Sequence, residues 1–389
     1  MSSSLHRRNV YLREDMNVNK RVNKIGLGGF SFIKGIAILV IIFGHISGEF
    51  DMSQLTWFRP VFVVLGFLKT PFIPLFFIIS GYGFKVNSVR KMLKKTIKAL
   101  MVPYIFVMIG FCIFQPLVAY VRTQDWSYSV NAGITWGFAF LLGLPEPGKV
   151  ILGYKLANCS IVWFILALFW AHNILNLILK KKQVVVQGIL VVVQGILVVV
   201  CALLGYFLCV YEVTYFCIPQ GLIATSYFYV GYLLKKHKML ERGLPHKWMY
   251  AAWAAIAALY ASWGYFDLCY GEFKFFPLDY LGVNFLALLL LKIGIYVGEC
   301  DGKILDIIKE VGIYSYWVIC IHSVEQKCIP WKRLALFTAE NQNIGFILAL
   351  FMKAAIITIC CMIIKRFEKW KYGKQKRYYE RKKLCSKID

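Results

Sequence analysis

The sequence predicts an all-α integral membrane protein, a ten-helix transmembrane bundle with both termini in the cytoplasm. The first observation is composition: of 389 residues, 59% are hydrophobic and only 17% are charged, whereas a soluble protein carries roughly a quarter charged residues. The second is that the apolar residues gather into ten runs. The third is that basic residues concentrate in alternate connections between these runs. Together these observations exclude a soluble domain, a disordered chain and a fibrous repeat.

A helix needs about 20 mostly apolar residues to cross a hydrocarbon core about 30 Å thick. The ten predicted spans are Phe32–Ile46, Phe72–Phe84, Ala99–Tyr120, Ile161–Leu179, Val184–Val210, Gly221–Leu234, Trp248–Tyr265, Pro277–Val297, Val311–Ser323 and Ile344–Ile364. A further apolar stretch, Leu55–Thr70, contains Arg59 and Pro60 and is followed by Pro71. We interpret it as a re-entrant or interfacial segment, since a full span there would make eleven.

The net charge of +25, from 45 Lys and Arg against 20 Asp and Glu, would suggest a nucleic acid partner in a soluble chain. In a membrane protein, cytoplasmic connections are expected to hold the basic residues. With the N-terminus inside, the cytoplasmic segments hold 35 of the basic and 10 of the acidic residues, which is the whole net charge. Those segments are 1–34, 85–98, 180–182, 235–247, 292–310 and 365–389. The charge is therefore a topology signal, and it favours ten spans, a lipid bilayer as partner and no nucleic acid.

Three regions follow from this pattern. Residues 1–31 form a basic cytoplasmic segment without a cleavable signal peptide, residues 32–366 the transmembrane domain, and residues 367–389 a basic cytoplasmic tail suited to anionic lipid. The twelve cysteines show no CxxC pairing or metal-ligand spacing, so neither a disulfide framework nor a metal site is predicted.

The segment VVVQGIL occurs at 184–190 and again, unchanged, at 191–197. Seven residues bring the second copy back to within about 20° of the first on a helix, so Gln187 and Gln194 share a face. One interpretation is a polar seam in a pore. We favour a tandem duplication in which small residues such as Gly195 line a helix contact.

Ionisable groups inside spans are costly and are functional candidates by default. The strongest is His45 in the first span, with Lys34 eleven residues before it. That spacing puts both side chains on one helix face, about 16.5 Å apart along the axis. A cation at the cytoplasmic surface and an imidazole at depth suit a long substrate with an anionic head, such as an acyl-coenzyme A. The alternative is a topology-setting lysine and a histidine bonded to a neighbouring helix.

Six segments, in order along the chain, resemble the acyltransferase family 3 membrane proteins. They are FIKGIAILVIIFGHI, PLFFIISGYGF, VRKMLKKTIKALMVPY, IVWFILALF, SYFYVGYLLKKHK and IKEVGIYSYWVICIHS. The resemblance covers about Phe32 to Arg366 and marks a stand-alone member without an appended soluble domain. It implies transfer of an acyl group, most often acetyl, from cytoplasmic acyl-coenzyme A across the bacterial cytoplasmic membrane to a hydroxyl of a surface or exported polysaccharide, or of its lipid-linked precursor. Glycan-synthesis or export machinery would be a partner.

The same resemblance implies roles for single residues. His45 would be the catalytic histidine, because imidazole titrates near neutral pH and can take the hydroxyl proton; whether it instead carries the acyl group covalently stays open. Lys34 would bind the donor phosphate. The basic loop would also contact phosphate through Arg90, Lys94, Lys95 and Lys98. Here the family usually has two arginines, and this chain has lysines, which cannot hold phosphate bidentately; plain topology charges explain the loop equally well.

Four further residues are possible substrate contacts. Ser80, in Ser-Gly-Tyr at the end of the second span, could orient a substrate or permit close helix packing. Trp163 could stack on a sugar or belong to an aromatic belt. His322 and Glu325 share a helical face and could bind a glycan acceptor or simply pair with each other. His172 is interpreted as a packing residue.

Two other functions compete with the enzyme. Ten spans with buried polar residues also describe a transporter or exporter of glycans or small metabolites, and a third hypothesis is a non-catalytic sensor or anchor. Transporters often carry similar halves, and the only repeat here is the local heptad. The sequence therefore favours the enzyme.

Overall fold

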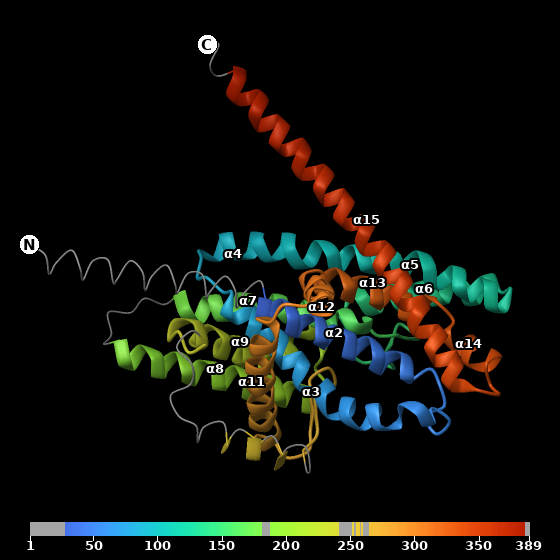
Figure 1. Cartoon of the computed structure of the whole chain (residues 1–389), viewed down its shortest axis with the longest axis horizontal. Coiled ribbons are helices and arrows are strands. Elements are labelled where there is room, and N and C mark those ends of the chain that lie inside the picture. Colours follow the sequence, from blue (N-terminus) through green and yellow to red (C-terminus); the bar gives the residue numbers. More distant parts are fainter. Residues whose placement is uncertain are drawn as a thin grey trace, which may run out of the picture.

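The computed structural model describes residues 28–180, 187–240, 251–252, 254–256, 258–259 and 264–385, and within these it is built almost entirely of helices (Figure 1). The α-helices are α2 (Phe30–Ser47), α3 (Arg59–Tyr82), α4 (Val89–Thr96), α5 (Val102–Thr123), α6 (Trp126–Leu141), α7 (Trp163–Lys180), α8 (Gln187–Val210), α9 (Ile218–Lys236), α11 (Leu278–Gly298), α12 (Lys303–Ile313), α13 (Ser315–Cys328), α14 (Trp331–Phe337) and α15 (Gln342–Cys385). Short helical turns are η2 (Thr56–Phe58), η3 (Ile97–Met101), η4 (Ser160–Val162) and η5 (Tyr215–Cys217). The strands form two antiparallel hairpins of two-residue strands, β1 (Val150–Ile151) with β2 (Tyr154–Lys155) and β3 (Phe266–Asp267) with β4 (Glu272–Phe273). The predicted all-α membrane class is confirmed for this part of the chain.

Six helical segments among the described residues are long and apolar enough to cross a membrane. They are Phe30–Ser47, Val89–Thr123, Ser160–Lys180, Val191–Val210, Leu278–Gly298 and Gln342–Phe367. Half of the predicted span Trp248–Tyr265 and all of residues 1–27 lie outside the described residues. Neither ten spans nor the side of the termini is confirmed, and both stay predictions.

The segment expected to be re-entrant is instead the first half of a continuous helix. α3 runs from Arg59 to Tyr82 with Pro71 and Pro74 inside it, so the predicted separation of Leu55–Thr70 from the second span is wrong. Each proline removes one backbone donor. Neighbouring helices can compensate such losses within a membrane protein, and Pro71 and Pro74 are both buried.

The predicted span Val311–Ser323 is also wrong as a single helix, because α12 ends at Ile313 and α13 begins at Ser315. Close packing accompanies the break. Gly312, next to it, lies against the backbone carbonyl of Ser31 in α2, where any side chain would collide. The break allows α12 to pack along α2 while α13 turns toward α5 and α15.

Helix α6 has no counterpart among the predicted spans. Its 16 residues include Ser, Asn, Gly and Thr, which lower its hydropathy below that of an isolated span. It pairs with α5, where Trp136 stacks on Phe111 with ring centroids 4.9 Å apart and Gly133 fits against Pro116. Ser129 is buried, whereas Ser127 and Asn131 are exposed, so α5 covers one face of α6 only.

Helix α9 occupies the centre of the bundle, packed against α3, α7 and α8. The crossing of α3 and α9 depends on two glycines, since Gly81 lies against the carbonyl of Phe228 and Gly231 against the carbonyl of Ile78. Small residues permit this close approach of two backbones. Most residues of α9 are buried by these neighbouring helices.

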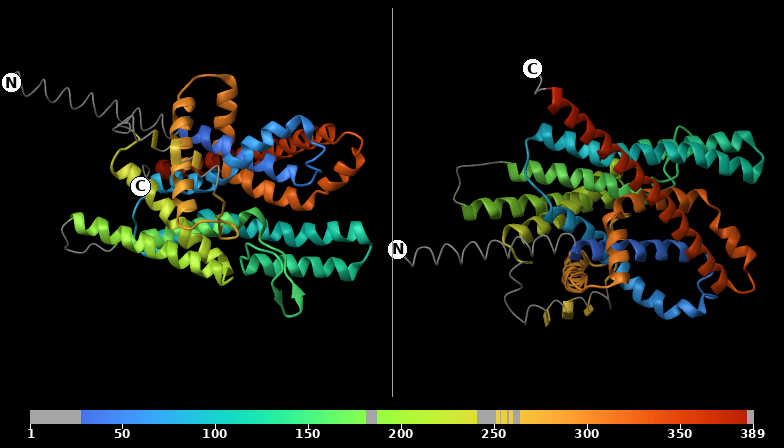
Figure 2. Two further views of the ribbon diagram at one scale, coloured as in Figure 1. Left: turned by 90° about the horizontal axis from the view of Figure 1, so that it is seen from below. Right: turned by 45° about the horizontal axis from the view of Figure 1, so that its top comes forward.

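The remaining helices surround this centre. α11 runs steeply across the directions of α2 and α8 in Figure 1, and α15 crosses α2 and α13 and continues beyond the body (Figures 1 and 2). In the duplicated heptad, Gln194 is buried, but a side chain at Gly195 would meet open space. The helix contact predicted for Gly195 is therefore wrong, while residues 184–186 lie outside the described part.

Candidate functional site

His45 lies in the last turn of α2 and lines a cavity of about 370 Å³. The helix ends there because Gly48 follows as its C-cap, and the Ser47 hydroxyl donates to the Gly44 carbonyl at 2.8 Å. The His45 side chain is exposed rather than enclosed by neighbouring helices. Its imidazole is therefore accessible to a substrate that enters the cavity.

Aromatic, polar and aliphatic side chains line the rest of this cavity. Trp163, the first residue of α7, lies in its wall, and the β3–β4 hairpin contributes Asp267 and Tyr270. The polar groups Asn158, Ser160, Gln326 and Lys327 complete the polar part of the lining. A cavity that combines aromatic faces with hydrogen-bonding groups suits a polar organic molecule.

A buried ionic cluster lies directly behind His45, formed by side chains of three helices. Glu325 of α13 accepts hydrogen bonds from the His322 Nδ1 at 2.6 Å and from the Trp331 indole nitrogen at 2.9 Å. The Lys353 ammonium of α15 lies 3.0 Å from both carboxylate oxygens. Lys353 and His322 have no exposed surface, and Glu325 is only 5% exposed. Because both carboxylate oxygens of Glu325 have hydrogen-bond donors, the cost of burying this ion pair is offset.

These contacts determine the tautomer of His322. An ionised carboxylate can only accept hydrogen bonds, so the Nδ1 of His322 carries a proton that it donates to Glu325. The Nε2 of His322 is buried and has no hydrogen-bond partner. The His322 ring lies close to the His45 ring, with centroids 5.5 Å apart and planes inclined at 47°.

Gln326 connects this cluster to the end of α2. Its side-chain oxygen accepts from the Lys353 ammonium at 2.5 Å, and its nitrogen donates to the His45 carbonyl at 3.3 Å. The same nitrogen lies 3.2 Å from a carboxylate oxygen of Glu49. The position of the His45 main chain thus depends on side chains from α13 and α15.

Burial raises the pKa values of two titratable groups beside the cavity. Burial raises the pKa of the Cys269 thiol well above its ordinary value, and nearby carboxylates, above all Asp267, raise it further. Burial also raises the pKa of Glu146, with Lys149 opposing the shift. A protonated thiol is a poor nucleophile, so Cys269 does not compete with His45 as the reactive group.

The opposite end of the bundle can be identified from contacts among α2, α3, α4 and α7. Phe30, at the start of α2, meets Tyr82 edge-on with centroids 4.9 Å apart. The Asn87 backbone, just before α4, donates to the Asn176 side chain near the end of α7 at 2.9 Å. Trp163 in the cavity lies 13 residues earlier on α7, about 20 Å away at 1.5 Å per residue.

The predicted phosphate-binding residues lie at this opposite end. Lys34 is partly buried on α2, and the unbroken helix keeps it on the face of His45, about 16.5 Å away along the axis. The basic residues of α4 and η3 are all exposed: Arg90, Lys94, Lys95 and Lys98. The structure therefore groups the cations at one end and His45, Trp163, His322 and Glu325 at the other.

Ser80 does not line the His45 cavity. It is half-buried beside the close contact of Gly81 with Phe228, a position that fits the packing interpretation. His172 is likewise remote from the cavity, between the rings of Phe84 and Phe228.

Sequence reasoning missed Lys353, although the signal was present. It is a lysine in the middle of the apolar run Ile344–Ile364, and an ionisable group at that depth needs a partner. Gln326, Asp267 and Asn158 carried no comparable signal, because polar residues near the ends of spans are common.

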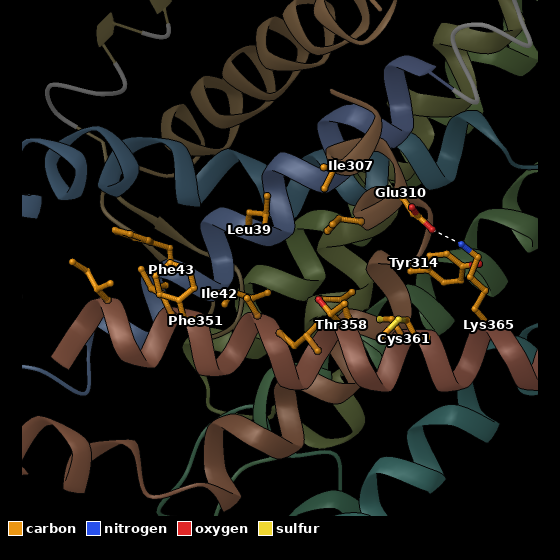
Figure 3. Close-up of a pocket in the computed structure, with 17 residues that line it drawn as sticks. Leu39, Ile42, Phe43, Ile307, Glu310, Tyr314, Phe351, Thr358, Cys361 and Lys365 are labelled. Atoms are coloured by element: carbon orange, nitrogen blue, oxygen red, sulfur yellow. Dashed lines mark hydrogen bonds and ion pairs between the residues drawn. The ribbon is translucent and has the colours of Figure 1, made fainter. Parts of the chain in front are cut away.

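A second, larger cavity of about 750 Å³ lies between α2, α12, α13 and α15. Leu39, Ile42 and Phe43 of α2 face Phe351 of α15 across it, and the ion pair of Glu310 with Lys365 lies at one end (Figure 3). Its lining is largely aliphatic and aromatic and contains no histidine. This lining suits the binding of a hydrocarbon chain better than it suits acid–base catalysis.

Comparison with known proteins identifies one family. The model of acyltransferase family 3, described as an acyltransferase domain, matches residues 27–366. No curated protein and no solved structure matches the chain. Among the described residues, no group of three or more His, Cys, Asp and Glu side chains is arranged to hold a metal ion.

Proposed function

The chain belongs to acyltransferase family 3, and from this premise we propose that it is a membrane O-acyltransferase with His45 as its catalytic residue. The donor is a cytoplasmic acyl-coenzyme A, with acetyl as the acyl group. The acceptor is a hydroxyl of a cell-surface or exported polysaccharide, or of its lipid-linked precursor. The protein acts in the cytoplasmic membrane of a bacterium, alongside glycan-synthesis or export machinery.

The observation that carries this proposal is the accessible imidazole of His45 in a polar and aromatic cavity. Acyl transfer needs a group that accepts the hydroxyl proton while oxygen attacks the thioester carbonyl. The new C–O bond forms, the C–S bond breaks, and the proton passes through His45 to the departing thiolate. No other histidine lines this cavity in the described part of the chain.

The separation of cations from His45 supports a long donor. Lys34 and the basic residues of α4 and η3 lie at the end of the bundle opposite to the cavity. Phosphate groups would contact the cations while the thioester reaches His45. The lysines provide charge without bidentate geometry, so we expect phosphate binding that weakens as salt is added.

The cavity lining supports a carbohydrate acceptor. Trp163 and Tyr270 offer aromatic faces, and Asp267 and Asn158 offer hydrogen-bonding groups for hydroxyls. Sugars combine apolar C–H faces with hydroxyl edges, which match these two kinds of side chain. Trp163 and Asp267 are therefore proposed acceptor contacts.

The first test is donor cleavage by purified protein in nanodiscs. Wild type should release labelled acetate, or transfer it to acceptor, from acetyl-coenzyme A. His45→Ala should lower turnover by about 10²–10⁴-fold, the usual contribution of a general base. His172→Ala, which removes a buried histidine remote from the cavity, should retain turnover.

Turnover retained in His45→Ala would overturn the role of this residue. If wild type neither binds nor cleaves any acyl-coenzyme A, the enzyme proposal fails and the transporter becomes the better hypothesis. Donor binding measured separately distinguishes that result from a preparation that lacks its acceptor.

A further inference from the structure

The buried cluster of His322, Glu325 and Lys353 is ionic, although apolar side chains could fill the same space. A buried pair that only fills space can often be replaced by apolar residues without loss of stability. Here the cluster ends in a histidine nitrogen that faces no partner and whose ring adjoins that of His45. An unsatisfied buried polar atom is costly, and at His322, unlike at His172, this atom belongs to a ring beside the proposed catalytic histidine, which points to a function.

We propose that His322 is a positioning residue for His45, held in the required tautomer by Glu325 and Lys353. During turnover the Nε2 of His322 accepts a hydrogen bond from one ring nitrogen of His45. The other ring nitrogen of His45 is then left with its lone pair directed at the acceptor hydroxyl. This inference rests on the proposed acyltransferase function.

The geometry permits this hydrogen bond after a small movement. Ring centroids 5.5 Å apart place the edges of two five-membered rings within about one hydrogen-bond length of each other. Catalytic hydrogen bonds are often long or misaligned before substrate binds. Rotation of the His45 side chain, which is exposed to the cavity, would align it without moving the buried His322.

Proton balance follows from the contacts. When His45 takes the hydroxyl proton, it becomes an imidazolium that donates to the Nε2 of His322. The Glu325 carboxylate, on the far side of His322, stabilises the added positive charge. When the thiolate of coenzyme A leaves, His45 returns the proton to sulfur, and no oxidant, metal or further reactant is needed.

Lys353 and Gln326 link the buried Glu325 to the main chain of His45. Lys353 contacts both oxygens of Glu325 and the Gln326 amide, and Gln326 holds the His45 carbonyl. The charged or titratable groups around the two histidines are Glu325 and Lys327 of α13, Lys353 of α15, Glu49 just after the end of α2, and Asp267 and Tyr270 in the cavity wall. Glu325 accepts a hydrogen bond from His322 and forms an ion pair with Lys353.

The test separates positioning from structural support by removing the two buried charges singly and together. Glu325→Gln leaves Lys353 unpaired and Lys353→Met leaves Glu325 unpaired, so each should lower the thermal midpoint. The double variant Glu325→Gln with Lys353→Met removes both charges and should recover most of that midpoint. We expect its kcat to stay about 10²-fold below wild type, with KM for acetyl-coenzyme A changed less than about twofold.

His322→Gln supplies an independent test that leaves the Glu325–Lys353 pair in place. We expect a similar loss of kcat, and the rise of kcat with pH should move to lower pH because His45 loses the acceptor that favours its protonated form. His172→Gln is the matched control, since it removes another buried histidine with an unpartnered ring nitrogen. It should change neither kcat nor the pH profile.

A double variant that recovers both its thermal midpoint and full turnover would show a structural role only, and would overturn the inference. An unchanged kcat and pH profile in His322→Gln would do the same. Failure of the proposed function gives a different result, because wild type itself would then not turn over.

Discussion

At the scale of single residues, the two lysines Lys353 and Lys34 differ in burial and in their neighbours. Lys353 is fully buried and neutralised by Glu325. Lys34 is partly buried on the helix that carries His45. A lysine that is already paired is less available to a ligand, so of these two lysines we propose Lys34 as the phosphate ligand.

Replacing Lys34 tests that role. Lys34→Ala should raise the KM for acetyl-coenzyme A about 10–100-fold, because a hydrogen bond to a charged group contributes about 1.5–3 kcal/mol. Lys34→Arg, which retains the charge, should stay near wild type. Steady-state kinetics in nanodiscs measure both, with Lys91→Ala, an exposed lysine of α4, as the control. An unchanged KM in Lys34→Ala would remove the phosphate role.

At the scale of helices, close packing around α9 positions the site. α9 contacts α3 and α7, which carry cavity residues such as Phe76 and Trp163. The α3–α9 crossing leaves no room for side chains at Gly81 and Gly231. Any change in that crossing would move one wall of the cavity relative to His45.

A pair of glycine substitutions tests this argument. Gly81→Ala adds a methyl group against the Phe228 carbonyl and should cost about 1–3 kcal/mol of stability, as overpacking does. Gly195→Ala adds the same group into open space on α8 and should be neutral or stabilise by up to about 1 kcal/mol. Thermal unfolding in detergent compares the two, and equal midpoints would contradict the packing argument.

At the scale of the whole molecule, the bundle has two chemically different ends. One holds the start of α2 and the basic helix α4, and the other holds the His45 cavity and the hairpin β3–β4. With the positive-inside rule, the basic end should face the cytoplasm. A donor would then enter from the cytoplasm and an acceptor from outside.

Site-directed labelling tests this orientation. In a background with the exposed Cys112 and Cys300 replaced by serine, Lys91→Cys in α4 should react with an impermeant maleimide only after the membrane is opened. Leu152→Cys, at the 82% exposed tip between β1 and β2, should react in intact cells. The reverse pattern would overturn both the topology and the proposed direction of transfer.

The sequence by itself determined the membrane class, the family segments and the prominence of His45, because hydropathy, charge bias and an ionisable group within a span are local properties. It predicted Lys34 on the His45 face because an unbroken helix has a fixed period. It could not show that α3 continues through Pro71, that α12 and α13 break at Tyr314, or that α6 pairs with α5. Those outcomes depend on contacts with neighbouring helices. Only the tertiary structure brought Lys353 to Glu325 and His322 to His45, because these pairs lie 28 and 277 residues apart in the chain and meet through packing that no local pattern encodes.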